Sequence, residues 1–332
     1  MTMQVNERAP RRRAVLAGVA ALAAAAALPA RAQGSGAPVK LVVGYPPGGL
    51  TDSVARLLAE RLAPELQRNV IVENRPGAGA RVSAAWFRRQ PADGEWLMLG
   101  TDSLMVHAPL VFKSLPFDVF TDFTPVSQVM AFPYAFATGT APKVQAMAEY
   151  LAWLKANPTK AAFGHPAPGS APHFWGLLLG EKVGVPMTHV PYQGGAPMLA
   201  AVAGGQVSAG INAVAVDMIE MHRSGRTRIV AVSGDKRVPQ LAEVPSAAEL
   251  GIPSVPPGFG GLYLPAGASA ALANRYAEAT HKVLAQADVR ARLEGFGLQV
   301  VSGSPREFTA LMRSDAATWR PIIEASGFKL DS

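Results

Sequence analysis

The sequence predicts an α/β protein of two lobes, each built on a mixed or parallel sheet flanked by helices, with two segments crossing between the lobes. From residue 38 onward, short apolar runs typical of buried strands alternate with amphipathic segments typical of helices. Two extended stretches, residues 125–138 and 258–264, interrupt this alternation. We therefore expect residues 38–130 and 257–332 to form the first lobe, and residues 131–256 to form the second.

The individual elements follow from this alternation in chain order. A mostly apolar run forms the first strand, and the helix after it repeats an apolar residue every three or four positions. The expected strands are residues 39–43, 69–73, 96–100, 161–164, 187–190, 207–211 and 228–232. The expected helices are residues 51–66, 80–89, 144–156, 172–183, 197–203, 270–287 and 305–324. With 332 residues, 49% of them hydrophobic, the chain can bury cores of this size.

The N-terminus has the pattern of an export signal. Three arginines at residues 11–13 precede an apolar run over residues 14–28, and Ala30-Arg31-Ala32 offers a cleavage site. This run is too short to span a hydrocarbon core of about 30 Å comfortably, so a membrane anchor is the weaker interpretation. We expect residues 1–32 to be a signal peptide, through the general or the twin-arginine route. The mature protein would then begin near Gln33 in a bacterial periplasm.

Charge and cysteine content exclude several classes of function. Of 31 basic and 24 acidic residues, five basic and one acidic precede residue 34, which leaves 26 and 23 in the rest. No basic stripe with interleaved aromatic residues is present, so no nucleic-acid partner is expected. The absence of cysteine excludes thiolate metal sites, disulfides and a lipid on an N-terminal cysteine.

The segment from Leu41 to Asp52 carries the clearest functional signal. Its strand runs into a turn of two prolines and two glycines, and an amphipathic helix follows at once. The first N–H groups of a helix have no intrahelical partner, and the helix dipole is positive at that end. Because glycine lets a ligand approach these groups closely, the segment predicts a site for a small anion. A bulky residue at Gly49 is expected to block the turn.

Enzyme and cofactor motifs give weaker signals. Gly77-Ala-Gly79 follows a strand but lacks the third glycine of a dinucleotide fingerprint, and Pro76 interrupts it. The chain contains no G-x-S-x-G, S-x-x-K, H-E-x-x-H or P-loop motif, so an exported hydrolase remains only an alternative. We expect no enzymatic activity and no cofactor.

Several ordered segments then point to one family. They are Tyr45-Pro-Pro-Gly-Gly-Leu-Thr-Asp52, Val72-Glu-Asn-Arg-Pro-Gly-Ala-Gly79, Leu115-Pro-Phe-Asp118, Asp122-Phe-Thr-Pro125, Pro168-Gly-Ser-Ala-Pro-His173, His189-Val-Pro-Tyr-Gln-Gly-Gly-Ala-Pro197, Gly204-Gly-Gln-Val207 and Leu264-Pro-Ala-Gly267. With these segments in this order, residues 38–330 resemble the Bug-type solute-binding proteins of tripartite tricarboxylate transporters.

The resemblance implies a periplasmic binding protein, type II-like and usually monomeric, whose lobes close on a small organic carboxylate. It implies that two loops, here Pro46 to Asp52 and His165 to His173, grip the ligand, and that the closed protein docks on a membrane permease. A protein that presents its ligand to a sensor would have the same sequence features, so this alternative stays open.

The chain departs from the family pattern at five places. Leu50 replaces the usual third glycine of the first turn. His165 and Pro168 stand where a small hydroxyl residue and an asparagine are usual. Asn212 lies where an acidic residue is common, and Phe259 precedes Gly260 in place of an aromatic pair. These departures predict a pocket that is more apolar than usual or differently shaped. They leave the ligand open among aliphatic diacids, aromatic carboxylates, amino acids and uncharged analogues.

The candidate ligand-binding residues come from the two loops and from strand ends. The set is Tyr45, Pro47, Gly48, Gly49, Leu50, Thr51, Asp52, Thr101, Asp102, Ser103, His165, Gly169, Ser170, His173, Tyr192, Asn212 and Phe259. Most have a structural alternative, such as helix capping for Thr51 and Ser170, support of the helix start for Asp52, or packing for Tyr192 and Phe259. His165 and His173 could form a zinc pair, but the spacing shows no third ligand, so no metal is predicted.

Overall fold

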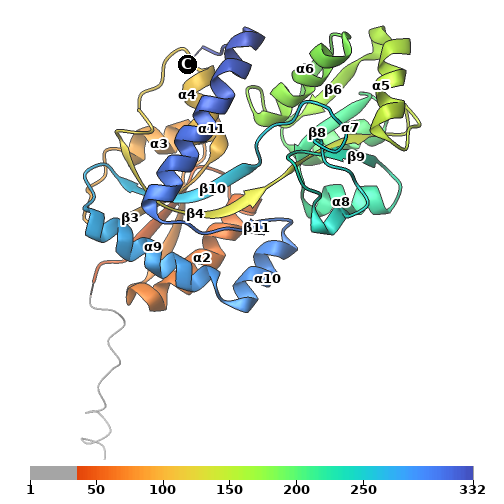
Figure 1. The fold of residues 1–332 in the computed structure, drawn as a ribbon. Coiled ribbons are helices and arrows are strands. Elements are labelled where there is room, and N and C mark those ends of the chain that lie inside the picture. The colour runs from red at the N-terminus through yellow and green to blue at the C-terminus, as the bar shows by residue number, and fades with distance from the viewer. Residues whose placement is uncertain (1–35, 332) are drawn as a thin grey trace, which may run out of the picture. The chain divides into compact units, whose positions relative to one another are not determined.

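The computed structural model describes residues 36–331, and the expected signal peptide, residues 1–32, lies outside them. Residues from Ala37 onward form one compact unit that contains two β-sheets, one in each lobe (Figure 1). Within the described part of the chain, no helix combines the length and apolar character needed to cross a membrane.

The first lobe is built on a six-stranded sheet in the order β11-β4-β10-β3-β1-β2. Strands β1, β2 and β3 are parallel, whereas β10 lies antiparallel between β3 and β4, and β11 is antiparallel to β4. The strands are β1 (Val39–Val43), β2 (Val70–Asn74), β3 (Trp96–Thr101), β4 (Phe123–Phe132), β10 (Gly258–Pro265) and β11 (Gln299–Val300). The sheet is therefore mixed.

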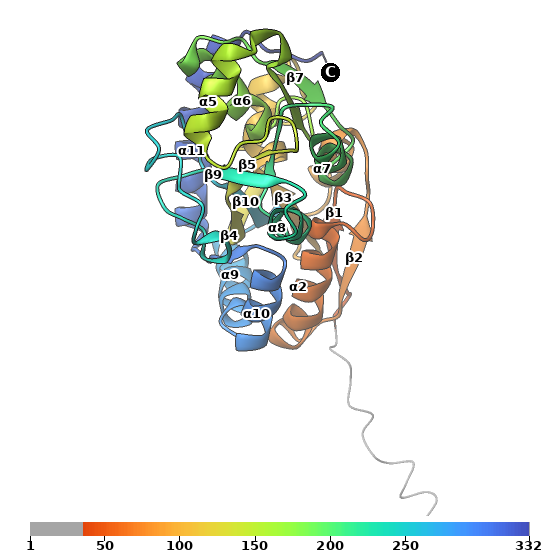
Figure 2. The ribbon, with the colours of Figure 1, turned by 90° about the vertical axis from the view of Figure 1, so that its right-hand side faces the viewer.

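Helices cover both faces of this sheet, as the alternation along its strands requires. Leu41 and Leu97 belong to the core beneath α2 (Leu50–Leu66) and α9 (Ala270–Leu284), and Val42 and Met98 belong to the core on the opposite face. That opposite face carries α3 (Arg81–Phe87), the π-turn η2 (Ser103–His107), α4 (Ala108–Val111) and α11 (Pro305–Ser326). Figure 2 shows α2 beside α9, with α10 (Ala287–Gly295) at the same end.

The second lobe contains a five-stranded sheet in the order β7-β6-β8-β5-β9. Strands β6, β7 and β8 are parallel, and β5 is antiparallel to both β8 and β9. The strands are β5 (Tyr134–Thr138), β6 (Ala162–His165), β7 (Thr188–Pro191), β8 (Ala209–Ala213) and β9 (Arg228–Val232). The helices are α5 (Met147–Ala156), α6 (Ala171–Val183), α7 (Gly195–Ala203) and α8 (Val216–Arg223).

Two antiparallel strands connect the lobes. β4 continues through Pro133 into β5, and β10 brings the chain back from the second lobe. The two strands pair along their length, from Gly258 opposite Phe132 to Pro265 opposite Phe123, and they run side by side between the lobes in Figure 1. Of the two extended stretches in the sequence, residues 125–138 fall within β4 and β5, and residues 258–264 fall within β10.

One hydrophobic core extends across both lobes. It joins Met98 and Phe87 of the first lobe to Phe136 and Phe174 of the second. Trp319 of α11 lies at the junction, with its ring centroid 6.0 Å from that of Phe174. On this side, α11 holds the two lobes together through packed aromatic side chains.

The expected elements appear, with some differences. The helix expected over residues 270–287 is two helices, because the backbone at Gln286 is extended and caps a new helix. The sequence also missed α8, the turn and short helix over residues 103–111, and the two-residue strand β11. Elements of two to nine residues are too short to show a helical or strand period.

Candidate functional site

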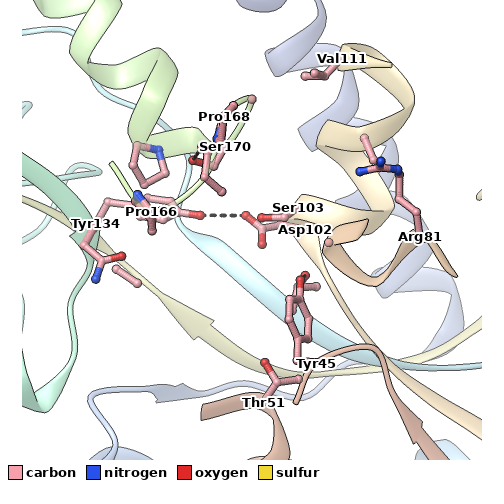
Figure 3. A pocket seen from close by; sticks show the side chains of 18 of the residues that line it. Tyr45, Thr51, Arg81, Asp102, Ser103, Val111, Tyr134, Pro166, Pro168 and Ser170 are labelled. Carbon is pink, nitrogen blue, oxygen red and sulfur yellow. Dashed lines mark hydrogen bonds between the residues drawn. The ribbon is translucent and has the colours of Figure 1, made fainter. Parts of the chain in front are cut away.

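A cavity of about 540 Å³ lies between the lobes. Residues from the first lobe, the second lobe and the C-terminal segment line it (Figure 3). They are Tyr45, Thr51, Gly79, Arg81, Thr101, Asp102, Ser103, Ala108, Val111, Phe112, Phe132, Tyr134, Pro166, Ala167, Pro168, Gly169, Ser170, Pro172, Asn212, Ala213 and Leu330. Arg81 and Asp102 are the two charged residues in this lining, and most of the others are apolar.

The turn between β1 and α2 is held in place by Asp52. Its carboxylate accepts hydrogen bonds from the N–H of Gly48 (2.9 Å), from Asn74 Nδ2 (2.8 Å) and from Arg56 Nε (2.8 Å). The hydrogen bond and charge of Arg56 lower the pKa of Asp52 to about 2. Asp52 is buried beneath the turn and does not line the cavity, so it positions the turn. The Gly48 N–H is taken by this bond and is not free for a ligand.

Thr51 is the residue of this turn that lines the cavity. The first helical bond of α2 joins Ser53 N–H to the carbonyl of Gly49, so the N–H groups of Leu50 and Thr51 precede the helical ladder. Pro47, Gly48, Gly49 and Leu50 are exposed at the rim and do not line the cavity. Gly49 itself needs no special backbone conformation, because its backbone is extended and an added Cβ would have its nearest contact at 3.9 Å. That a bulky residue there blocks the turn stays a prediction.

Asp102 lies at the centre of the cavity wall, at the end of β3 (Figure 3). Burial raises the pKa of its carboxyl to about 6, although the Tyr134 hydroxyl donates a 2.8 Å hydrogen bond to Oδ2. Tyr134 belongs to the second lobe, so this hydrogen bond joins the lobes. Thr101 forms a 3.1 Å hydrogen bond with the Tyr45 hydroxyl on the first-lobe side.

Arg81 provides the cation of the cavity, and the sequence interpretation missed it. Its guanidinium lies 3.8 Å from the centroid of the Phe112 ring, and burial lowers its pKa. The turn before it is strained, since Ala78 (φ 47°) and Ala80 (φ 70°) are left-handed without being glycine. Gly44 makes room for this turn, because a Cβ there would lie 2.2 Å from the Cβ of Ala80. The available signal is the glycine turn of residues 77–79, which directly precedes Arg81.

The second-lobe loop of residues 166–170 forms the facing wall. Ser170 is the N-cap residue of α6, but its side chain makes no capping hydrogen bond. Its hydroxyl instead donates a 2.7 Å hydrogen bond to the carbonyl of Ala167. Gly169 has a φ of 75°, and a Cβ there would lie 2.8 Å from Cγ1 of Val111 in the first lobe. The loop therefore approaches the first lobe as closely as glycine permits. In the view of Figure 3, it lies across Asp102 from Arg81.

The predicted histidines lie behind this loop and do not line the cavity. His165 and His173 are fully buried, and His189 of β7 joins them. One ring nitrogen from each of the three side chains lies within 4.8 Å of the other two. A third histidine thus accompanies the pair, through a strand pairing that sequence spacing does not reveal.

The remaining candidates divide between cavity and core. Asn212 of β8 lines the cavity. Tyr192 packs near Gly164 against the α7 core instead. Phe259 is buried, with its ring edge-to-face against Phe308 at 5.7 Å, so it packs the crossover strand and does not line the cavity.

Comparisons with known proteins agree with this architecture. Residues 54–328 match the sequence family described as "Tripartite tricarboxylate transporter family receptor". The chain is 31% identical to Protein BugT of Bordetella pertussis over 320 residues, which cover 95% of each chain. Among solved structures, Rpa4515 of R. palustris with adipate matches with a TM-score of 0.79 and 28% identity, over 89% of this chain and 98% of that one. MatC of Rhodopseudomonas palustris with bound malate matches with a TM-score of 0.74 and 27% identity, over 86% and 98%. The predicted two-lobed α/β fold is confirmed.

Proposed function

Because the chain belongs to the receptors of the tripartite tricarboxylate transporter family, we propose that it captures a small organic carboxylate between its lobes and delivers it to a membrane permease. The observation that carries this proposal is that one cation, Arg81, and Thr51 at the N-terminus of α2 line the same largely apolar cavity. Both features favour a bound anion. Relatives of the same fold bind malate and adipate, which supports a carboxylate ligand.

The proposed binding mode uses both lobes. The ligand carboxylate meets the Arg81 guanidinium and the hydroxyl and N–H of Thr51, while the apolar wall around Phe112 and Phe132 covers its carbon chain. The loop of residues 166–170 then covers the ligand from the second lobe. Ligand binding favours the closed form only to the extent that these second-lobe contacts form on closure.

This mode requires no covalent chemistry. The lining contains the hydroxyls of Ser103 and Ser170, but no histidine that could act as their base. The Ser170 hydroxyl is already bonded to the carbonyl of Ala167. We therefore propose a receptor that releases its ligand unchanged. We also place it in the periplasm after cleavage near Ala32, as the N-terminal sequence pattern predicts.

A thermal-shift screen tests the proposal. The mature protein, beginning at Gln33, is heated with a panel of mono- and dicarboxylic acids beside their amides and methyl esters. A ligand that binds only the folded state increases the free energy of unfolding by RT ln(1 + [L]/Kd), and the melting temperature rises as a result. We expect a shift with at least one acid and its loss with the corresponding ester. Equal shifts with acid and ester, or turnover of the ester, would contradict the proposal.

A further inference from the structure

Three histidines meet at one edge of the second lobe, outside the cavity. They come from the end of β6 (His165), from β7 (His189) and from the first turn of α6 (His173). Their ring centroids are 4.7 Å apart for His165 and His173, 5.3 Å for His165 and His189, and 4.3 Å for His173 and His189. None of these three rings lines the cavity, so the proposed ligand binding does not explain why they lie together.

Strand pairing and helix packing produce the cluster. β6 and β7 are parallel with Phe163 opposite His189, and His165 follows Phe163 on the same face because side chains alternate along a strand. α6 packs on this face and presents His173 from its first turn. All three rings are thus held by regular elements, which is the support that a metal site requires.

The hydrogen bonds of His165 prepare one nitrogen as a ligand. Its Nδ1 lies 2.9 Å from the carbonyl of Ala167, and a carbonyl only accepts, so Nδ1 carries the proton. Nε2 then has a lone pair, which accepts the 3.1 Å hydrogen bond from Nδ1 of His189. A metal ion held by both nitrogens takes the place of this proton, which moves to Nε2 of His189. Two nitrogens bound to one tetrahedral zinc ion at about 2.05 Å lie about 3.3 Å apart. A backbone carbonyl on the far nitrogen is the usual partner of a metal-binding histidine.

His173 supplies the third nitrogen. Its Nε2 is buried and has no hydrogen-bond partner among the described residues, while its Nδ1 accepts a 3.2 Å bond from the N–H of Gly169. A buried donor without an acceptor costs free energy. Movement of the proton from Nε2 to Nδ1 would give Nε2 a free lone pair and remove this cost when a cation binds. It would also release the N–H of Gly169, a residue of the cavity loop.

The surroundings keep His165 and His173 neutral. The ring of Phe328 lies edge-on to His173 at 4.6 Å, and Phe174 packs beside it. Burial lowers the pKa of His165 to about 4 and that of His173 to about 3. Neutral imidazole is the metal-binding form, and it suits zinc, copper and nickel better than magnesium or calcium. His189 is partly exposed and provides access from solvent.

We propose that His165, His173 and His189 bind one divalent transition-metal ion, with Zn²⁺ as the expected ion. The ion is held by Nε2 of His165, Nδ1 of His189 and Nε2 of His173, which leaves a fourth position for water. The ion also replaces the His165–His189 hydrogen bond, and its binding removes the His173 acceptor from the N–H of Gly169. The site thereby couples the metal to the loop of residues 166–170, and this coupling, unlike the metal binding itself, rests on the proposed function.

Zinc titration of the mature protein without a histidine tag tests the site. The protein is first treated with a chelator and dialysed, and Zn²⁺ binding is followed by calorimetry with no carboxylate present. We expect one Zn²⁺ per chain, and a loss of at least about tenfold in affinity for His189→Gln. His281→Gln is the matched control, because His281 is an exposed histidine on α9 and its loss should leave zinc affinity unchanged.

Two readouts make the outcome decisive. Co²⁺ added in place of zinc should give the visible absorption of a four-coordinate site in the wild-type protein, whether or not the variant folds. Failure of the wild-type protein to bind zinc near one equivalent would overturn the site. So would unchanged zinc binding by a folded His189→Gln protein, which would indicate adventitious surface binding. Neither result bears on the carboxylate screen, which needs no added metal.

Discussion

At the residue scale, the cavity combines one cation and one buried acid. Arg81 attracts an anion, whereas an ionised Asp102 would repel it. Burial resolves the conflict by raising the pKa of Asp102 to about 6, so that the carboxyl is partly protonated near neutral pH. Two further side chains interact with Asp102. The Tyr134 hydroxyl donates a hydrogen bond to it, and the pKa of Asp315 is raised to about 7 by burial and by the charge of Asp102.

The titration of Asp102 predicts a pH dependence of ligand affinity. Below about pH 6, Asp102 is neutral and does not repel a carboxylate; above it, Asp102 becomes charged and affinity falls. Unit charges about 10 Å apart at an effective dielectric constant of about 20 repel by about 1.7 kcal/mol, so we expect a loss of roughly tenfold between pH 5 and pH 7.5. Calorimetry at both pH values, with an acid that is ionised at both, measures it.

Asp102→Asn is the matched variant for this prediction. The amide keeps the shape of the carboxyl and carries no charge, so the affinity of the variant should hardly change between pH 5 and pH 7.5. If the variant keeps the full pH dependence of the wild-type protein, another group is responsible, and the role assigned to Asp102 is wrong.

At the element scale, the turn between β1 and α2 depends on one glycine more than on its neighbour. Gly48 has a φ of 87°, whereas Gly49 is an extended N-cap with a φ of −79°. Left-handed backbone costs a residue with a side chain about 1–2 kcal/mol. The sequence predicts a glycine turn here, but residue identity alone does not show which glycine has the left-handed conformation.

Paired alanine substitutions test this assignment. Gly48→Ala should lower the free energy of unfolding by about 1–2 kcal/mol, and weaken ligand binding if the turn shifts. Gly49→Ala should be neutral or stabilise by up to about 1 kcal/mol, because alanine reduces the entropy of the unfolded chain. Urea denaturation of the two variants compares them directly. Equal losses in both would show that the turn has another conformation in solution.

The other elements show the same limit of sequence reasoning. Long periodic helices such as α2 and α11 were predicted to within two residues at each end, because their apolar stripes are strong. The break between α9 and α10 was missed, since alanine and glutamine at residues 285–286 do not mark a helix end. The antiparallel course of β10 was also missed, because strand direction depends on the whole connection.

At the scale of the whole molecule, the site depends on contacts between distant parts of the chain. Arg81, Tyr134 and Leu330 reach the cavity from three separate segments, and no local motif predicts that they meet. His189 joins His165 and His173 for the same reason, through the pairing of β7 with β6. The sequence located the two loops that face the cavity; the fold selects which of their residues line it.

The same scale explains how closure is constrained. The core that runs from Met98 to Phe174 through Trp319 stays packed on the α11 side, and β4 and β10 connect the lobes. Val111 of α4 belongs to this same core, and α11 contacts both α4 and α6, so the wall between Gly169 and Val111 lies on the packed side. Motion of the second lobe is therefore expected to pivot about α11 and the two connecting strands.

The affinity of Arg81→Gln for the acid identified in the screen tests the central claim most directly. Arg89→Gln is the control, because Arg89 lies exposed just beyond the same helix and does not line the cavity. Charge-assisted hydrogen bonds are worth about 1.5–3 kcal/mol. We predict that calorimetry will show at least about tenfold weaker binding for Arg81→Gln and unchanged binding for Arg89→Gln. Wild-type affinity in a folded Arg81→Gln protein would contradict the assignment of this cavity as the carboxylate site.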